Sequence, residues 1–576
     1  MMLFEVWVPE KTVKLLVAGE ERAMERGDDG WWRLSVDASP GADYAYVLSD
    51  SSGPLPDPRS PWQPNGVHGP SRVYDHSAFA WTDQAWTGRQ LPGSILYELH
   101  IGTFTPAGTF DAAIERLDHL VDLGVDLVEL LPVNAFNGEY NWGYDGVCWY
   151  APHEPYGGPD GMKRFVDAAH ARGLGVVLDV VYNHFGPSGA YAPMFAPYLS
   201  KHGSNPWGDS INLDGPLSDE VRRYIADNVL MWLRDYHVDG LRLDAVHALV
   251  DHSAVNLLEQ LAVEVETLSA HLGRPLSLIA ESDLNDPRLI TPREAGGFGL
   301  TAQWDDDVHH ALHTLLTGER QGYYGDFGSL DCLQTVLEGA FFHAGTWSSF
   351  RQRHHGRPVD RSLVPGHRFV AFLQNHDQIG NRAIGDRLSA LLSPGLLKVG
   401  ATLLLTGPFT PMLFMGEEWA AGSPWQFFTS HPEPELADAV RTGRRREFAA
   451  HGWASADVPD PQDRATFERS KLDWAEPAKP GHAEILALYK RLIALRRQYS
   501  DLSDPWLSKV EVWHGDNFVV IRRGGCVIAA NLAPIAQTVS LRAVPSKVLL
   551  ATAEGVVLQR DRVELPAQSA VVVAAR

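Results

Sequence analysis

Three short apolar segments, far apart in the chain, each end in a carboxylate. Asp244 closes "GLRLD", Glu281 follows "SLIA", and Asp377 ends "FLQNHD". A single aspartate in such a place is more often a helix cap or a loop anchor than a catalytic group. Three carboxylates without a His or Cys ligand set indicate acid and nucleophile chemistry rather than metal chemistry. The reaction that needs paired carboxylates around a neutral polar substrate is glycoside cleavage.

An arginine accompanies the first of these carboxylates. The segment "GLRLDAV" (residues 240–246) has apolar residues at every second position, which is typical of a buried strand. Arg242 and Asp244 would then share one strand face, where the positive charge favours the ionised aspartate. Glu281 follows an apolar run, and we expect burial there to raise its pKa, as suits a general acid.

These carboxylates need a scaffold that brings distant segments together. In the middle of the chain, apolar runs alternate with segments of helical periodicity, such as residues 253–273. Eight such runs predict a parallel (β/α)8 (TIM) barrel, whose active site lies at the carboxyl ends of its strands. We expect this barrel over residues 91–502, with an insertion after the third run. The runs are "SILYELHIG", "VDLVELLPV", "GLGVVLDVVYNH", "GLRLDAV", "PLSLIAES", "GLTAQW", "RFVAFLQNHD" and "PMLFMGEE".

The two ends of the chain alternate in the manner of strands instead. Segments such as "FEVWVPE" and "WWRLSVD" predict an N-terminal β-sandwich, followed by a Pro-rich linker, within residues 1–90. Segments such as "FVVIRRG" and "SAVVVAAR" predict a C-terminal β-sandwich over residues 503–576. The expected fold is therefore an α/β barrel flanked by two β-sandwiches.

The composition limits the classes of function. Lys and Arg number 49 against 72 Asp and Glu, a formal net charge of −23, which argues against a nucleic-acid partner. No apolar run is long enough to cross a membrane, and the first residues do not resemble a signal peptide. Cys148, Cys332 and Cys526 form no CxxC pattern, so neither disulfides nor a zinc site are expected. We expect a cytoplasmic protein without a membrane partner.

Four stretches in one order resemble a known family. "DVVYNH", "GLRLDAV", "IAES" and "FLQNHD" are similar to the four signature regions of the α-amylase family of glycoside hydrolases. The resemblance implies Asp244 as the nucleophile, Glu281 as the general acid/base and Asp377 as a third carboxylate that stabilises the transition state. It further implies that the sugar in the cleaved subsite contacts Tyr144, Asp145, His184, Arg242 and His376.

Two later stretches narrow the resemblance. "AQWDDDVHHALHTLLTGE" and "GEEWAAGSPWQFFTSHPEPELADAVRTGRRREF" resemble the maltooligosyltrehalose trehalohydrolases within that family. This implies retaining hydrolysis of the α-1,4 bond next to the terminal trehalose of maltooligosyl trehalose, with other α-glucans as related ligands. The rival interpretations are a 1,4-α-glucan branching enzyme, which passes the glycosyl group to a sugar hydroxyl, and a noncatalytic glucan-binding protein. The intact carboxylate trio argues against the last.

Some polar and aromatic residues keep more than one interpretation. In "WDDDVHH" and just after it, His309 and His313 have the spacing of metal ligands, but the cluster would also suit sugar hydroxyls or a solvated helix start. Trp207, Trp304 and Trp425 are either sugar platforms or core residues. We expect no cofactor and no metal, and leave out the calcium that Asn183 helps to hold in many amylases. The expected contacts to the trehalose unit are His247, Asp306, His310, Gln378 and Asn381.

Overall fold

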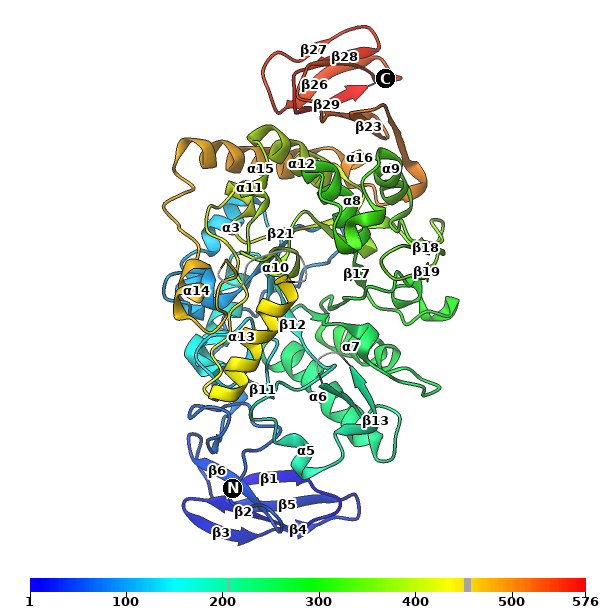
Figure 1. The fold of residues 1–576 in the computed structure, drawn as a ribbon. Coiled ribbons are helices and arrows are strands. Elements are labelled where there is room, and N and C mark those ends of the chain that lie inside the picture. The colour runs from blue at the N-terminus through cyan, green and yellow to red at the C-terminus, as the bar shows by residue number, and fades with distance from the viewer. Residues whose placement is uncertain (206–207, 450–456, 576) are drawn as a thin grey trace.

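The middle of the chain folds into a closed barrel of eight parallel strands in our computed structural model (Figure 1). The structure describes residues 1–205, 208–449 and 457–575. Each predicted run contributes one strand, and the last strand pairs with the first, which confirms the (β/α)8 prediction. The strands are β8 (Leu96–Leu99), β9 (Leu127–Leu130), β12 (Gly175–Val180), β15 (Gly240–Leu243), β16 (Ser277–Ala280), β17 (Ala302–Trp304), β20 (Phe369–Phe372) and β21 (Thr410–Phe414).

Helices cover the outside of the barrel. The helix expected over residues 253–273 begins at Leu257, because the Asn256 side chain caps it by accepting from the backbone of Leu258. It ends at Gly273, whose φ of 67° is the left-handed conformation common at helix ends. The longer helices of the barrel region are α4 (Gly158–Ala171), α6 (Ser218–Asp235), α7 (Leu257–Leu272), α8 (Asp306–Thr317), α9 (Leu330–Gly339), α12 (Pro394–Thr406), α13 (Pro434–Ala449) and α15 (Pro480–Gln498). The shorter ones are α1 (Ile101–Phe104), α2 (Phe110–Ile114), α3 (Leu117–Leu123), α10 (His376–Gly380), α11 (Leu388–Leu391), α14 (Arg464–Arg469) and α16 (Ser500–Ser503).

The interior of the barrel changes from apolar to charged along the strands. Apolar residues, among them Leu96, Leu127, Val177 and Ile279, form one cluster. Because strand side chains alternate, the residue two positions after each of these lies on the same inner face. Those positions carry acids, and Arg242 pairs in register with one of them, Asp179. We call this set the charged layer: Glu98, Glu129, Asp179, Arg242 and Glu281.

Antiparallel sheets flank the barrel at both ends of the molecule (Figure 1). In the N-terminal pair, the rings of Phe4 and Tyr44 meet across the two sheets with centroids 4.9 Å apart. The C-terminal pair encloses its own apolar cluster, so both predicted β-sandwiches are confirmed. The N-terminal strands are β1 (Met2–Trp7), β5 (Trp31–Val36) and β4 (Glu25–Arg26) against β3 (Glu20–Ala23), β2 (Val13–Val17), β6 (Asp43–Leu48) and β7 (Ser71–Arg72). The C-terminal strands are β22 (Val510–His514), β23 (Phe518–Arg523), β24 (Cys526–Asn531), β29 (Ser569–Ala575) and β26 (Pro545–Ala551) against β25 (Gln537–Ser540), β28 (Arg562–Leu565) and β27 (Val557–Leu558).

The connections on the carboxyl side of the barrel are long. The insertion expected after the third strand contains α5 (Ala192–Phe195) and a hairpin of β13 (Leu199–Asn205) and β14 (Gly208–Ile211). Two further pairs are β10 (Asn134–Ala135) with β11 (Cys148–Pro152) and β18 (Thr346–Ser348) with β19 (Arg353–His355). Across the described ranges, none of the helices combines the length and the apolar character that a membrane crossing needs.

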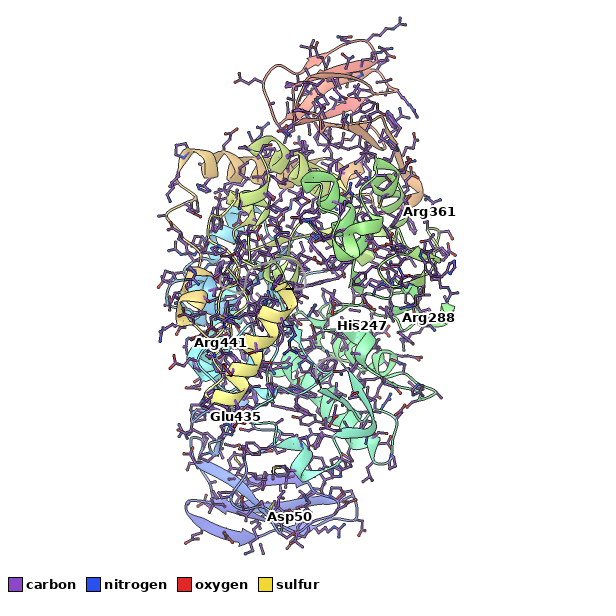
Figure 2. All side chains as sticks on the ribbon, viewed as in Figure 1. Asp50, His247, Arg288, Arg361, Glu435 and Arg441 are labelled. Atoms are coloured by element: carbon purple, nitrogen blue, oxygen red, sulfur yellow. The ribbon has the colours of Figure 1, made fainter. Side chains whose placement is uncertain are left out.

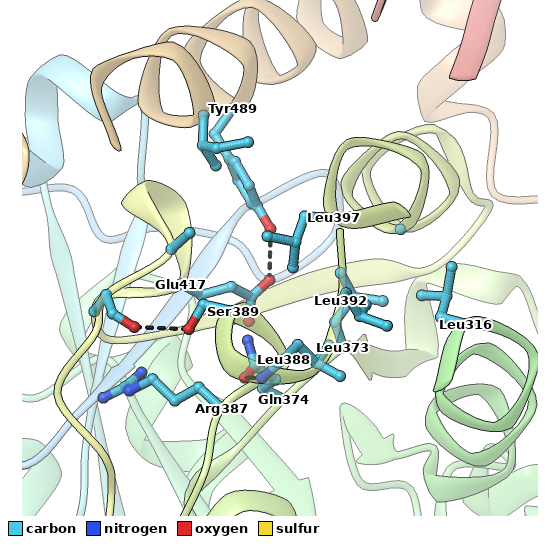
Figure 3. A pocket seen from close by; sticks show the side chains of 14 residues that line it. Leu316, Leu373, Gln374, Arg387, Leu388, Ser389, Leu392, Leu397, Glu417 and Tyr489 are labelled. Carbon is cyan, nitrogen blue, oxygen red and sulfur yellow. Dashed lines mark hydrogen bonds between the residues drawn. The ribbon is translucent and has the colours of Figure 1, made fainter. Parts of the chain in front are cut away.

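Helix α15 is fixed to the barrel by a buried carboxylate. Tyr489 of α15 donates a hydrogen bond of 3.0 Å to Glu417, which follows β21 (Figure 3). Glu417 lies at a small internal cavity that Leu316, Leu373 and Gln374 also line. Burial raises the pKa of Glu417 to about 8, so the group is uncharged at neutral pH.

Candidate active site

The predicted carboxylate trio lies at the carboxyl ends of three barrel strands. Asp244 follows β15, Glu281 follows β16, and Asp377 is in the short helix α10 after β20. Asp244 and Asp377 line a cavity of about 440 Å³. Helix α13 contributes to its wall and passes in front of the barrel, as the labelled Glu435 and Arg441 show (Figure 2). The other residues of the cavity are Asn141, Trp142, Tyr144, Asp145, His184, His376, Asn381, Phe427, Val440, Arg444 and Glu447.

Arg242 connects the carboxylates. Its Nη1 lies 2.8 Å from both Asp179 and Asp244, and its Nη2 lies 3.5 Å from Glu281. The guanidinium also packs 4.1 Å from the ring centroid of Trp304 in β17. A fully buried cation is costly unless it is paired, and here three acids and an aromatic face compensate it.

The "GLRLDAV" strand is shorter than predicted. Strand β15 ends at Leu243, and Ala245 takes a φ of 41°, in the left-handed region. The extension of the strand to residue 246 was therefore wrong, because this turn breaks the alternation. The turn directs the backbone N–H of Ala245 at Glu281, with 2.5 Å between N and Oε2. Backbone geometry thus fixes the position of the glutamate relative to the aspartate before it.

Glu281 has the environment of a proton donor. Burial is the largest cause of a rise in its pKa to about 8. Arg242 opposes that rise, while the negative charges of Asp244, Asp306 and Asp377 add to it. A carboxyl group with this pKa carries its proton at neutral pH.

An amide holds the neighbouring carboxylate in place. Asn183, after β12, donates to the Asp244 carboxylate at 2.8 Å and to its backbone carbonyl at 3.1 Å. The same side chain contacts His184 through its oxygen, with 2.5 Å between Oδ1 and Nδ1. Asn183 therefore acts on the site through hydrogen bonds, a role that the sequence analysis did not predict.

Tyr144 forms part of the cavity wall. Its hydroxyl donates to Asp179 at 2.6 Å, and its ring stacks on His376 with centroids 5.0 Å apart. The preceding Gly143 has a φ of 109°, and a Cβ there would lie 2.2 Å from the Pro132 carbonyl oxygen. Only glycine is compatible with this close approach, so it determines where Tyr144 sits.

The other expected sugar contacts divide into two groups. Asp145 and His184 line the cavity together with Tyr144, and Asn381 joins it to a second cavity of about 280 Å³ that Gln378 also lines. The remaining three, His247, Asp306 and His310, line neither cavity. His247 lies near the middle of the barrel region in Figure 2, with its Nδ1 3.9 Å from Asp283.

The "WDDDVHH" cluster forms the start of helix α8 and packs inward. His309 interacts with the Tyr324 hydroxyl at 3.1 Å, and His313 lies 2.7 Å from Glu319. His310 packs against the ring of Tyr323, with centroids 4.8 Å apart. Within the described residues, no three His, Cys, Asp or Glu side chains group as ligands of a metal ion.

The candidate aromatic platforms are core residues where the structure describes them. Trp304 is buried under Arg242, and Trp425 is buried and donates to the backbone carbonyl of His376 at 2.9 Å. The platform interpretation of these two was wrong, because their faces are covered by protein. Trp207 lies outside the described residues.

Sequence analysis overlooked the acid of the charged layer that contacts His376. Glu98 of β8 accepts hydrogen bonds from both the backbone and the ring of His376. The available signal was a glutamate at an inward position of the otherwise apolar run "SILYELHIG". The run contains no sign of its partner, which is 278 residues away.

Comparison with known proteins identifies the family. A family model for the alpha amylase catalytic domain matches residues 72–196. A malto-oligosyltrehalose trehalohydrolase of Arthrobacter ramosus is 62% identical over 86% of this chain and 87% of its own length. One from Mycobacterium tuberculosis is 58% identical over 92% of each chain. The chain belongs to the malto-oligosyltrehalose trehalohydrolase family. It is a glycoside hydrolase of the α-amylase family, as the four signature stretches predicted.

A solved structure has the same fold as this member of the malto-oligosyltrehalose trehalohydrolase family. The crystal structure of a Salmonella typhimurium protein, provisionally described as an alpha amylase, is 39% identical to this chain. It matches with a TM-score of 0.91 over 100% of this chain and 97% of its own. The match therefore includes both flanking sandwiches as well as the barrel.

Proposed function

We propose that this protein hydrolyses the α-1,4-glucosidic bond next to the terminal trehalose of maltooligosyl trehalose and releases trehalose. The names of the relatives from Arthrobacter ramosus and Mycobacterium tuberculosis, both called malto-oligosyltrehalose trehalohydrolase, support this substrate. Other α-glucans would bind as related ligands, and the reaction would serve the formation of trehalose from glucan in the cytoplasm. The single observation that carries the chemistry is that one buried guanidinium, that of Arg242, contacts both Asp244 and Glu281.

The proposed reaction proceeds with retention in two displacements. In the first, the Asp244 carboxylate attacks the anomeric carbon of the glucose unit next to trehalose, while Glu281 donates its proton to the leaving oxygen. The anomeric carbon–oxygen bond breaks, trehalose leaves, and a glycosyl ester with Asp244 forms. In the second, the ionised Glu281 takes a proton from water, whose oxygen attacks the same carbon and frees Asp244. Asp377 stabilises the positive charge that develops on the sugar ring.

The raised pKa of Glu281 fits this double role. An acid must hold its proton at working pH and still be able to lose it to the leaving group. Burial and the three acids around Glu281 supply that property, while Arg242 stays paired with Asp244. The two carboxyl groups of a retaining glycosidase stand about 5 Å apart, and a guanidinium shared between them is compatible with such a spacing.

We further propose roles in binding for the polar residues around the trio. The glucose in the cleaved subsite would stack on Tyr144 and bond to the charged and polar side chains of the 440 Å³ cavity. The trehalose unit would reach the loops after β15, β17 and β20. The proposed binding residues are Tyr144, Asp145, His184, Arg242, His247, Asp306, His310, His376, Gln378 and Asn381. In this scheme residues 91–502 form the catalytic domain, between an N-terminal domain of residues 1–90 and a C-terminal domain of residues 503–576.

One incubation tests the proposal. Maltotriosyl trehalose is incubated with the protein, and the products are identified by chromatography and by proton NMR at early times. We expect trehalose together with maltotriose that appears first as its α-anomer. A β-anomer would contradict retention, and release of glucose or maltose without trehalose would contradict the substrate. Chain transfer to a sugar hydroxyl, visible as altered iodine staining of amylose, would indicate a branching enzyme, and no turnover would indicate a noncatalytic glucan-binding protein.

A further inference from the structure

Glu98 uses both of its carboxylate oxygens on a single residue. Oε2 accepts the backbone N–H of His376 at 3.0 Å, and Oε1 accepts from the ring nitrogen Nδ1 of the same residue at 2.5 Å. Glu98 is 1% exposed, and His376 is equally buried. The pair therefore connects the first barrel strand, β8, to the start of α10 after the seventh.

The imidazole of His376 is held between two carboxylates. Its Nε2 lies 3.6 Å from Oδ2 of Asp377, on the side away from Glu98. One face of the ring stacks on Tyr144, and Trp425 donates to the backbone carbonyl. Since Glu98 accepts a hydrogen bond and the Asp377 carboxylate lies at ion-pair distance, the arrangement suits a ring that carries two protons.

The charges around His376 favour that doubly protonated ring. Burial by itself lowers the pKa of His376, but Asp377 and Glu98 outweigh it and raise the pKa to about 9. Arg242 opposes the rise. The other titratable groups that act electrostatically with the ring are Glu129, Asp179 and His100.

We propose that Glu98 is a positioning residue that keeps His376 as an imidazolium directed at Asp377. A fixed positive charge then lies beside the third carboxylate, where the glucose unit of the cleaved subsite binds. The inference rests on the proposed function for its substrate, but the hydrogen bonds that carry it do not. Without Glu98, the ring would lose an acceptor for its second proton, and the cavity would lose the charge.

The charged layer offers a matched control in Glu129. This residue pairs with Glu98 in the register between β8 and β9, so the two acids are neighbours of similar burial. Neither carboxylate oxygen of Glu129 has a hydrogen-bond partner within the described residues. Burial raises the pKa of Glu129 well above its ordinary value, which favours the uncharged form of the side chain. Replacement by glutamine therefore breaks no hydrogen bond at Glu129 and keeps the uncharged form that burial favours, whereas the same replacement at Glu98 removes one of the two oxygens that accept from His376.

The test compares Glu98→Gln with Glu129→Gln on maltotriosyl trehalose across pH. A glutamine at position 98 has one acceptor oxygen for two donors, so His376 should become neutral near neutral pH. We expect kcat/KM of Glu98→Gln to fall about 100-fold near pH 7.5, mainly through kcat, and to recover as the pH is lowered and the ring regains its proton. Glu98→Asp, which keeps the charge, should recover part of the activity. Glu129→Gln should stay within about twofold of the parent at each pH.

The inference is overturned if Glu98→Gln loses activity by the same factor at each pH. It is also overturned if kcat/KM of Glu98→Gln equals that of Glu129→Gln across the pH range. If Glu98→Gln fails to fold, the inference can be tested on the parent protein. NMR of the histidine-labelled parent protein should show His376 protonated at both nitrogens near neutral pH. A neutral ring would overturn the inference. This measurement needs no substrate. Failure of the proposed function would instead appear as absent trehalose release by the parent protein.

Discussion

Nη1 of Arg242 lies 2.8 Å from Oδ1 of Asp244, two residues further along the chain. The arginine is fully buried inside the barrel, whereas the aspartate reaches the cavity. The contact thus joins the barrel interior to the cavity and holds the proposed nucleophile in place. The same nitrogen also lies 2.8 Å from Oδ2 of Asp179, so Arg242 pairs with both aspartates.

Replacement of Arg242 should destabilise the protein and abolish activity. In Arg242→Leu, the buried Asp179 loses its charge partner, and breaking such a pair costs about 3–5 kcal/mol. We expect a clearly lower midpoint of thermal unfolding, measured by circular dichroism, and no detectable trehalose release. Arg242→Lys keeps the positive charge but lacks the planar, forked guanidinium. Its unfolding midpoint and activity should therefore lie between those of the parent protein and Arg242→Leu. A stable and active Arg242→Leu protein would contradict the proposed role.

Replacement of the proposed acid should affect turnover and leave binding intact. The amide of Glu281→Gln cannot donate a proton to the leaving oxygen, so we expect kcat to fall by about 10³-fold or more. Calorimetry should show substrate affinity near that of the parent protein. Near-normal turnover would remove Glu281 from the role.

The pH dependence of the parent enzyme should follow the proton on Glu281. Because its pKa is raised to about 8, the acid is protonated below that pH and loses its proton above it. We therefore expect kcat/KM to decline as the pH rises through about 8. The measurement is the initial rate of trehalose release in buffers of constant ionic strength. Activity that stays constant far above this value would show that the group does not act as the acid.

Substrate selection should depend on Asp306. This residue begins α8, and burial is the main cause of a rise in its pKa to about 7. A site that bonds to particular hydroxyls can reject an analogue by up to about 10⁴-fold. We expect kcat/KM of the parent enzyme for maltopentaose to lie far below that for maltotriosyl trehalose. In Asp306→Asn, the difference in kcat/KM between the two substrates should be smaller. His310→Gln gives a second test on the same helix. Equal rates of the parent enzyme on the two substrates would indicate a general α-amylase-type hydrolase.

Stability should change with pH at Glu417. Its pKa is about 8 in the folded protein, against an ordinary value of 4.5, so folding takes up a proton between these values. The contribution of this group to the free energy of unfolding is fully present below pH 4.5 and is lost as the pH rises to about 8. The loss is at most about 1.4 kcal/mol per pH unit. Glu417→Gln should lack this loss. The test measures the midpoints of thermal unfolding of the parent protein and Glu417→Gln at several pH values. Midpoints that change with pH in the same way in both proteins would contradict the prediction.

Several features of the barrel could be predicted because they depend on local sequence. Full burial of a parallel strand requires a continuous apolar run, and "SILYELHIG" and "RFVAFLQNHD" show it directly. Barrel strands run in one direction, so their carboxyl ends share a rim, and the positions of Asp244, Glu281 and Asp377 follow from that rule. Similar reasoning failed at Ala245, because a single left-handed residue ends the alternation without an apolar-to-polar change in sequence.

The sequence by itself determined which residues alternate inward along each strand, and through its motifs it determined the family. Only the tertiary structure decided which of those inward residues meet. Glu98 and His376 are 278 residues apart and touch because β21 pairs with β8 and closes the ring, while Glu129, on the adjacent strand, has no hydrogen-bond partner for its carboxylate within the described residues. The physical reason is that alternation is a property of one strand's backbone, whereas pairing depends on the order and register of all eight strands around the closed barrel.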